Sequence, residues 1–121
     1  MTNVTERTIK LLEVRPGFSP FETWIERIRD RVTRIKILSA IARLANPNYR
    51  GFKGVSGGVQ ELRIYYGPGY RVYFGLKGNL LILLLGGGDK QSQQRDIHEA
   101  QTNWKKYKDE IGRFQRKLSD N

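Results

Sequence analysis

Three short segments rich in apolar residues follow one another in the second half of the chain, and two glycine turns separate them. In residues 61–65 (ELRIY) and 70–76 (YRVYFGL), apolar side chains alternate with polar or aromatic ones, which is typical of strands with one buried face. Residues 80–85 (LLILLL) are apolar throughout, as in a strand that is buried on both faces. With turns at residues 67–69 (GPG) and 77–79 (KGN), the sequence predicts an antiparallel three-stranded meander.

Two helices are predicted before this meander. Ser19 offers an N-cap, Pro20 suits the first helical position, and Glu22 stands three residues after the cap, which together form a capping box. Asp30 is the expected cap of a second helix, which ends at residues 46–48 (NPN). Helical spacing predicts that the second helix buries a stripe formed by Val32, Ile35, Leu38, Ile41, Ala42 and Ala45.

The remaining elements complete the predicted fold. Residues 8–14 (TIKLLEV) indicate an opening strand, which we expect to be the fourth strand of the sheet, and residues 92–108 indicate a closing helix. The element order is therefore β-α-α-β-β-β-α, an α+β fold in which a helix hairpin packs on a small antiparallel sheet. We expect one domain over residues 1–121, with a core over about 8–107 and a flexible basic C-terminal tail over 108–121.

The composition narrows the classes of function. The 121 residues carry a formal net charge of +10 and an isoelectric point near 10.2, which favours an anionic partner such as nucleic acid, an acidic protein or a membrane surface. The alternative is a basic protein whose charge serves only solubility. The lack of cysteine excludes disulfides, thiolate metal sites and cysteine nucleophiles, and one histidine cannot build a histidine-rich metal site. We therefore expect neither a metal nor a cofactor.

Membrane insertion and export are not expected either. The longest apolar run, residues 80–85, is far too short to span a bilayer. The first residues (MTNVTERTIK) lack the apolar core of a signal peptide. The sequence therefore predicts a cytoplasmic protein with no membrane partner.

Three blocks of the sequence resemble the addiction-module killer proteins of the RelE/ParE toxin superfamily. The blocks are ELRI at residues 61–64, GPGYRVYF at residues 67–74, and GGDK-x-x-Q-x-x-DI at residues 87–97. The chain is most similar to the HigB-like, phage-associated branch, and the resemblance covers residues 8–107. Each block alone is weak, but their combination is specific.

This resemblance implies a toxin of a type II toxin–antitoxin module, which a cognate antitoxin holds inactive. In the HigB-like branch the antitoxin is usually a helix-turn-helix DNA-binding protein of the HigA type. Many members of the superfamily are mRNA interferases, metal-independent endoribonucleases that cleave mRNA on the ribosome and so inhibit translation. ParE members instead poison DNA gyrase with the same fold, so the fold does not decide the activity. A non-catalytic module that only binds RNA or antitoxin is the third alternative.

RNA cleavage of this kind makes the ribose 2′-OH attack the adjacent phosphate and leaves a cyclic phosphate, so it needs a base, a positive group and an acid. Arg71 is the first candidate, because it alternates outward from Val72 and Phe74 and its planar guanidinium can clamp two phosphate oxygens. The resemblance also aligns Arg71 with a strand arginine that contacts the scissile phosphate. An ordinary exposed strand arginine is the alternative.

Aromatic and basic side chains accompany Arg71 on the same face. Tyr73 could stack a base or donate to a phosphate, or it could simply pack across the strands against Tyr65. Arg63 and Tyr65 face the same way on the neighbouring strand. We therefore expect one cationic, aromatic surface, which suits single-stranded RNA.

Four further residues are candidates outside this surface. Lys90 follows three glycines where the last strand is expected to end; the resemblance implies an acid or a phosphate ligand there, and Asp89 could orient it. Lys53 could extend the RNA-binding surface. Alternatively, Lys53 and Lys90 are solvated charges in loops. His98 is expected at the edge of the buried stripe of the closing helix, as a surface or structural residue, or as a base if the helix end folds back over the sheet.

One departure from the superfamily puts the acid and base in doubt. Some members carry a catalytic tyrosine in the first two turns of the last helix, where this chain has RDIH at residues 95–98. His98, Asp96 or Tyr73 takes that role, or catalysis is weak, or the target differs. The three glycines 86–88 fit neither a Walker A motif nor a dinucleotide fingerprint.

Overall fold

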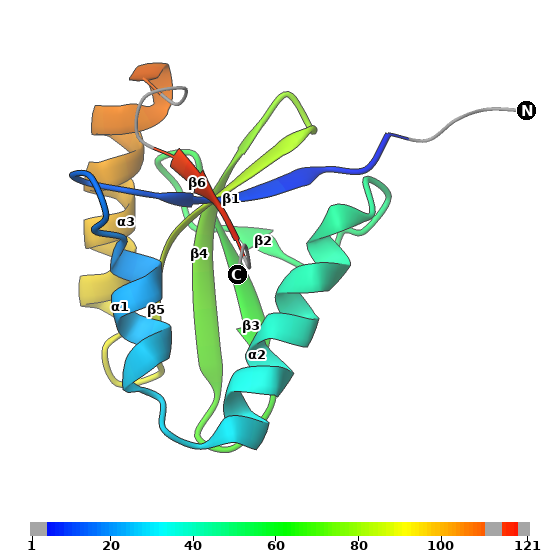
Figure 1. Cartoon of the computed structure of the whole chain (residues 1–121), viewed down its shortest axis with the longest axis vertical. Coiled ribbons are helices and arrows are strands. Elements are labelled where there is room, and N and C mark those ends of the chain that lie inside the picture. Colours follow the sequence, from blue (N-terminus) through cyan, green and yellow to red (C-terminus); the bar gives the residue numbers. More distant parts are fainter. Residues whose placement is uncertain (1–4, 111–114, 119–121) are drawn as a thin grey trace, which may run out of the picture.

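The computed structural model describes residues 5–110 and 115–118, and over them the chain is an α+β protein with three α-helices and a six-stranded, mostly antiparallel sheet (Figure 1). In chain order the elements are β1 (Thr8–Leu12), α1 (Pro20–Arg27), α2 (Arg31–Ala42), the 3-10 turn η1 (Arg43–Ala45), β2 (Lys53–Gly54), β3 (Val59–Ile64), β4 (Tyr70–Lys77), β5 (Leu81–Asp89), α3 (Gln93–Tyr107), the 3-10 turn η2 (Lys108–Glu110) and β6 (Gln115–Lys117).

The sheet has the strand order β2-β3-β4-β5-β1-β6. The predicted antiparallel meander is confirmed, because β3 pairs with β4 and β4 with β5 in antiparallel fashion. The sequence did not predict that β1 joins β5 in parallel, with Thr8 opposite Leu81 and Leu11 opposite Leu84. The sheet is therefore larger than predicted and is not wholly antiparallel.

The helix hairpin covers one face of the sheet and begins as predicted. The Ser19 hydroxyl accepts a hydrogen bond from the Glu22 amide at 3.2 Å, and the Asp30 carboxylate accepts one from the Thr33 amide at 3.0 Å. These caps satisfy amides that have no partner within the helix. Under the hairpin lies a core in which Phe21 and Ile37 pack with Phe74 and neighbouring sheet residues.

The predicted buried stripe of α2 is wrong for most of its members. Exposed fractions of 51%, 52% and 40% place Val32, Ile35 and Leu38 at the surface. The residues of α2 that face the sheet are instead Thr33, Ile37, Ala40 and Ile41. The helix has apolar residues on two sides, and its spacing alone cannot say which side meets the sheet.

The opposite face of the sheet is covered by α3. Its buried residues Ala100, Trp104 and Tyr107 pack with Tyr73 and other sheet residues in a second core, as the helical spacing predicted. The central strand β5 contributes to both cores, and its residues Ile82, Leu83, Leu84 and Leu85 are between 0% and 1% exposed. The prediction of a strand buried on both faces is therefore confirmed.

Part of the predicted flexible tail belongs to the fold. Residues 108–110 form η2, and β6 pairs with β1 so that Lys10 lies opposite Lys117. In Figure 1, the red strand β6 lies beside the blue strand β1. The Arg116 guanidinium anchors β6 by contacting the carboxylates of Glu13, at 2.6 Å, and Glu22. Residues 111–114 and 119–121 of the predicted tail lie outside the described residues.

Of the helices that the structure describes, none combines the length and apolar character that crossing a bilayer requires.

Candidate functional site

The turn between β3 and β4 fixes which residues of the two strands face each other. Gly69, at a φ of 86°, donates its amide to the carbonyl of Tyr66 across this turn. The resulting register places Arg63 directly opposite Arg71 and Glu61 directly opposite Tyr73. Because alternate residues of a strand share a face, all four side chains belong to the side of the sheet that α3 covers. The predicted common face of Arg63, Arg71 and Tyr73 is therefore confirmed.

Glu61 is the centre of this arrangement, and the sequence pattern predicted no role for it. Its side chain has no exposure to solvent, and it accepts hydrogen bonds from Arg63 Nε and from Gln93 Nε2, each at 3.0 Å. Burial disfavours the charged carboxylate, but the hydrogen bonds and the positive charge of Arg63 outweigh this effect, so the pKa of Glu61 lies below its ordinary value. A charged carboxylate therefore lies beneath the first turn of α3.

Arg71 is less accessible than predicted. The residue is 9% exposed, and its Nε lies 3.7 Å from Glu61 Oε2, too far for a hydrogen bond. This Nε is buried without a hydrogen-bond partner among the described residues. Buried donors are rarely left unpaired, and where they are, the group is often functional. Arg63 is the more open of the two guanidiniums, with a side chain 35% exposed.

Tyr73 does not belong to an exposed aromatic surface. It is 0% exposed, and its hydroxyl is buried next to the Glu61 carboxylate. Burial and the neighbouring charge of Glu61 raise the pKa of this phenol. The prediction that Tyr73 stacks a base is wrong for this conformation, because α3 covers the ring. The alternative of packing against Tyr65 is also wrong, since its cross-strand partner is Glu61.

The other candidates lie at the surface around this centre. Tyr65 is 88% exposed at the end of β3, and Lys90 is exposed directly after β5. Lys53 is exposed on β2, opposite Glu61, rather than in a loop. Asp89 has a structural role, because its Oδ1 accepts hydrogen bonds from the amides of Gln91, at 3.0 Å, and Ser92, at 3.1 Å, and so begins the turn into α3.

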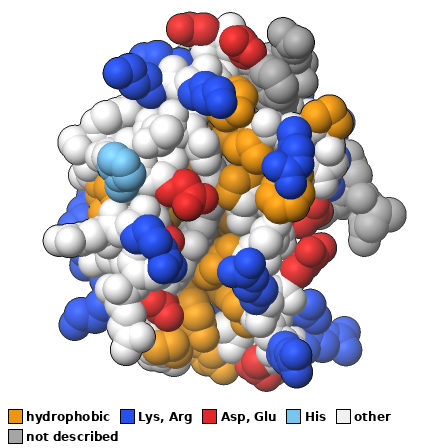
Figure 2. All heavy atoms as spheres, turned by 90° about the vertical axis from the view of Figure 1, so that its left-hand side faces the viewer, with side chains coloured by type: hydrophobic (Ala, Val, Ile, Leu, Met, Phe, Trp, Pro, Cys, Tyr) orange, Lys and Arg blue, Asp and Glu red, His pale blue; other side chains and the backbone are white. Residues whose placement is uncertain are grey.

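His98 is exposed on α3, as the prediction of a surface residue has it. The pale blue side chain in Figure 2 is the histidine of this chain, and it stands on the outside of the molecule.

Asp96, one of the alternatives for the missing tyrosine, is half-buried and accepts a hydrogen bond from the Ser92 hydroxyl. A side chain at Gly88 would overlap the Asp96 carboxylate, and Gly88 is the cross-strand partner of Arg71. Asp96 and Arg71 are therefore close neighbours.

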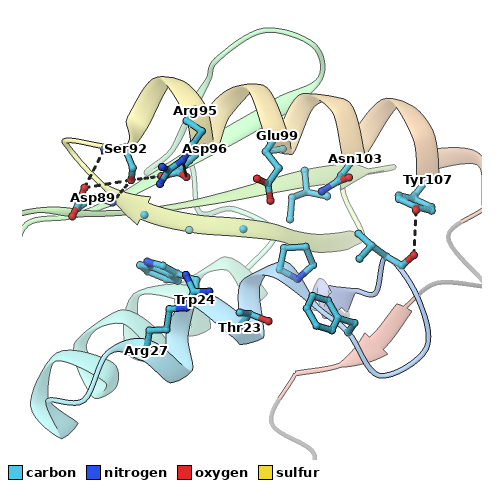
Figure 3. A pocket seen from close by; sticks show the side chains of 18 of the residues that line it. Thr23, Trp24, Arg27, Asp89, Ser92, Arg95, Asp96, Glu99, Asn103 and Tyr107 are labelled. Atoms are coloured by element: carbon cyan, nitrogen blue, oxygen red, sulfur yellow. Dashed lines mark hydrogen bonds and ion pairs between the residues drawn. The ribbon is translucent and has the colours of Figure 1, made fainter.

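A groove of about 1140 Å³ runs between α1 and α3 beside this centre. Its floor is the end of β5, where the three glycines 86–88 lie within the strand and not after it, contrary to the prediction from the sequence. Figure 3 shows Trp24, Thr23 and Arg27 on the α1 side and Asp96, Glu99 and Asn103 on the α3 side. In Figure 2, hydrophobic side chains form a band on this face, with charged side chains on both sides.

The groove carries charges of both signs. The basic residues that line it are Arg15, Arg27, Arg95 and Lys106, and the acidic ones are Asp89, Asp96 and Glu99. Several of them have partners, since Arg95 Nε lies 3.8 Å from Asp96 and the Arg15 guanidinium lies 4.1 Å from the centre of the Phe18 ring. Among the described residues, no group of three or more histidine, cysteine or acidic side chains is placed to hold a metal ion.

Sequence reasoning missed Glu61, Gln93 and the groove. Glu61 could have been found, because it precedes Arg63 by two residues and so shares its face. Nothing in the sequence marks Gln93, whose contact with Glu61 depends on how α3 lies across the sheet. The groove depends on β1 ending at Leu12 while β5 continues to Asp89.

Comparison with known proteins places the chain beside a relative of unknown function. No protein-family model matches the sequence. An uncharacterized protein from Haemophilus influenzae is 40% identical over 80 residues, which cover 66% of this chain and 81% of the relative. At this identity and coverage, the chain belongs to the same family as that Haemophilus protein.

Proposed function

We propose that the chain is the toxin of a type II toxin–antitoxin module of the RelE/ParE kind, and that it cleaves mRNA on the ribosome. The observation that carries this proposal is the cross-strand pair of Arg63 and Arg71. The guanidiniums of both residues lie next to the buried carboxylate of Glu61. With Glu61 between the two guanidiniums and Asp96 paired with Arg95, the cluster keeps a net positive charge at the end of the meander. Such a centre suits the extra negative charge of a phosphorane.

The arrangement of the three family-like blocks supports the same proposal. ELRI forms most of β3, GPGYRVYF forms the turn and much of β4, and the third block joins the end of β5 to the start of α3. Glu61 from the first block, Arg71 from the second and Gln93 from the third meet at one point. The helix hairpin on one face of the sheet and the antiparallel β3–β4–β5 meander are the parts of the fold that the resemblance implies.

In the proposed reaction, the ribose 2′-oxygen attacks the adjacent phosphorus and the bond to the 5′-oxygen breaks, giving a 2′,3′-cyclic phosphate and a free 5′-hydroxyl. Arg63 and Arg71 stabilise the phosphorane oxygens, and Glu61 fixes the direction of both guanidiniums. Asp96 accepts the 2′-OH proton, because it is the half-buried carboxylate beside Arg71. Lys90, exposed at the end of β5, donates a proton to the leaving oxygen.

The test is inducible expression of the parent chain and of Arg71→Ala, with the 5′ ends of cellular RNA mapped after induction. Arg31→Ala is the matched control, since it removes the same charge from the exposed start of α2. We expect new in-frame mRNA ends with the parent and the control, and about 100-fold fewer with Arg71→Ala, as for the loss of one transition-state donor.

Other outcomes lead to different conclusions. Growth arrest with intact mRNA and stalled gyrase cleavage complexes would replace this proposal with the gyrase alternative. Neither arrest nor cleavage by a folded parent chain would leave a module that only binds RNA or antitoxin. Because Arg71→Ala leaves Glu61 with one fewer cation, Arg71→Lys is tested beside it. It keeps the charge but loses the planar fork, so we expect reduced cleavage with a nearly unchanged melting temperature.

A further inference from the structure

The end of β5 has an open edge inside the groove. On one side, the last residues of β5 pair with β4 from Gly86 opposite Tyr73 to Asp89 opposite Tyr70. On the other side, β1 pairs only with Leu81 to Leu84. After Leu12 the chain leaves the sheet in a turn, in which the Val14 amide donates to the Phe18 carbonyl and the Phe18 amide donates to the Arg15 carbonyl. Residues 85–89 of β5 therefore have no neighbouring strand on this side.

Backbone groups at this edge are unpaired. Successive residues of a strand direct their N–H and C=O groups to alternate edges, so part of the backbone of residues 85–89 points into the groove. Apart from the ladder with β4, the described residues supply no hydrogen-bond partner to the backbone of Gly86, Gly87 or Gly88, and only the Asp89 amide reaches a side chain, Ser92 Oγ at 3.3 Å. Such an edge is the template that an added strand uses.

Among the three glycines of this edge, only Gly86 leaves room for a neighbouring side chain. A side chain at Gly87 would overlap the Trp24 ring on the α1 side, whereas a Cβ at Gly86 would meet no atom within 4 Å. Gly86 is the cross-strand partner of Tyr73 and so faces the α3 side. A strand beside β5 would therefore contact Trp24 with one residue and place the next side chain in the free space near Gly86.

Two charged side chains of the groove have no ion-pair partner among the described residues, and they indicate which side chains an added strand would present. Arg27 on α1 and Glu99 on α3 are exposed and have no ion-pair partner among the described residues. They stand on opposite walls (Figure 3), and successive side chains of a strand point to opposite faces. An added strand with an acidic residue next to a basic one would therefore form ion pairs with both Arg27 and Glu99. RNA fits this edge less well, because a nucleic acid cannot continue the ladder of backbone hydrogen bonds, and the exposed Glu99 would repel its phosphates.

We propose that the open edge of β5 binds an extended segment of a partner protein as an added strand, with adjacent acidic and basic residues facing Arg27 and Glu99. The segment occupies the place that β1 leaves free and forms backbone hydrogen bonds with residues 85–89. This interaction does not depend on the proposed nuclease activity, because the backbone of residues 85–89, Arg27 and Glu99 have no part in the proposed reaction.

The probe is a phage library of random nonapeptides, selected on the full-length chain. We expect enriched peptides with an acidic residue next to Lys or Arg. Their affinity should fall at least tenfold with Gly86→Val, whose Cβ meets no atom within 4 Å and whose side chain enters the free space, and should be unchanged with Arg31→Ala, far from the groove. With Arg27→Glu, the selection should change from acidic to basic residues at the position that faces α1.

Two further readouts separate strand addition from other binding. Methylation of peptide nitrogens should abolish binding at alternate positions only, and the bound peptide should protect the amides of residues 86–88 from hydrogen exchange. The proposal is overturned if no peptide is enriched, or if enriched peptides bind Gly86→Val as well as the parent. It is also overturned if a uridine dodecamer, and no peptide, protects these amides.

Discussion

At the scale of single residues, the buried Glu61 carboxylate decides the character of the candidate site. It neutralises one of the two guanidiniums and contacts both on the side of the sheet that α3 covers. A bound substrate phosphate would be a second anion beside the guanidiniums of Arg63 and Arg71. Burial of Arg71 against Glu61 also restricts its rotamers, so less freedom is lost when a phosphate binds.

Glu61→Gln should reveal this role in the pH dependence of stability. The folded pKa of Glu61 lies below its unfolded value, so ionised Glu61 stabilises the fold above the unfolded value, and this contribution is lost as the pH falls through the folded pKa. We expect Glu61→Gln to lower the free energy of unfolding by about 3 kcal/mol near neutral pH, as for a buried ion pair that loses one partner. The deficit should shrink below about pH 4. Urea unfolding at both pH values measures it, and an equal deficit at both would contradict the assignment.

Two adjacent glycines provide a second residue-scale prediction. Gly87→Ala should destabilise the chain by about 1–3 kcal/mol, because its methyl group would displace the Trp24 ring. Gly86→Ala is the matched control and should be nearly neutral, since its methyl group enters free space. Thermal melting of both variants tests the packing, and equal losses would show that Trp24 does not rest on Gly87.

For the residues of the candidate site, the sequence predicted which face of the sheet they lie on, but not how exposed they are. Alternation along β3 and β4 correctly put Arg63, Arg71 and Tyr73 on one side, because a period of two follows from strand geometry. It could not predict that Tyr73 is buried, since that depends on where α3 crosses the sheet. The same long-range packing hides Glu61 and leaves Lys90 and His98 exposed.

At the scale of elements, local capping was predictable and the buried side of α2 was not. Ser19 and Asp30 act within one turn of their own helices, so their roles follow from neighbouring residues. In α2, both the set with Ile37 and the set with Ile35 have helical spacing. Contact with Phe74 and its neighbours, far along the chain, selects the first set.

Paired substitutions in α2 test which side is buried. Ile37→Ala should lower the free energy of unfolding by about 2–5 kcal/mol, because it leaves a cavity in the core. Ile35→Ala removes the same atoms from a half-exposed position and should change stability by less than about 1 kcal/mol. Urea denaturation of both variants is the measurement, and a larger loss for Ile35→Ala would reverse the orientation of the helix.

At the scale of the whole molecule, Arg116 ties the end of the described chain to its beginning. Its guanidinium joins β6 to Glu13, just after β1, and to Glu22 of α1. The hydrogen bond from Arg116 is the main reason that the pKa of Glu22 lies below its ordinary value. Because both partners are partly exposed, solvent weakens the contribution of the pair to stability.

Arg116→Ala should therefore destabilise the chain by about 1 kcal/mol and return the pKa of Glu22 toward its ordinary value. The stabilisation by Glu22 in the parent is present above the unfolded pKa and disappears as the pH falls through the lowered folded pKa. An NMR titration of the Glu22 carboxyl carbon measures the shift. Lys117→Ala, an exposed neighbour without this contact, is the control and should leave the titration unchanged.

The position of β1 inside the sheet has a consequence for protein synthesis. Thr8 pairs with Leu81, and Lys10 pairs with Lys117, so β1 must wait for partners made more than half a chain later. Closing such long loops makes folding slow compared with local hairpins. While the ribosome is still making the chain, β3, β4 and β5 can form their meander, but the sheet is complete only after residue 117 has left the exit tunnel. A nascent chain thus carries a partial sheet with an exposed edge until residues 115–117 have emerged.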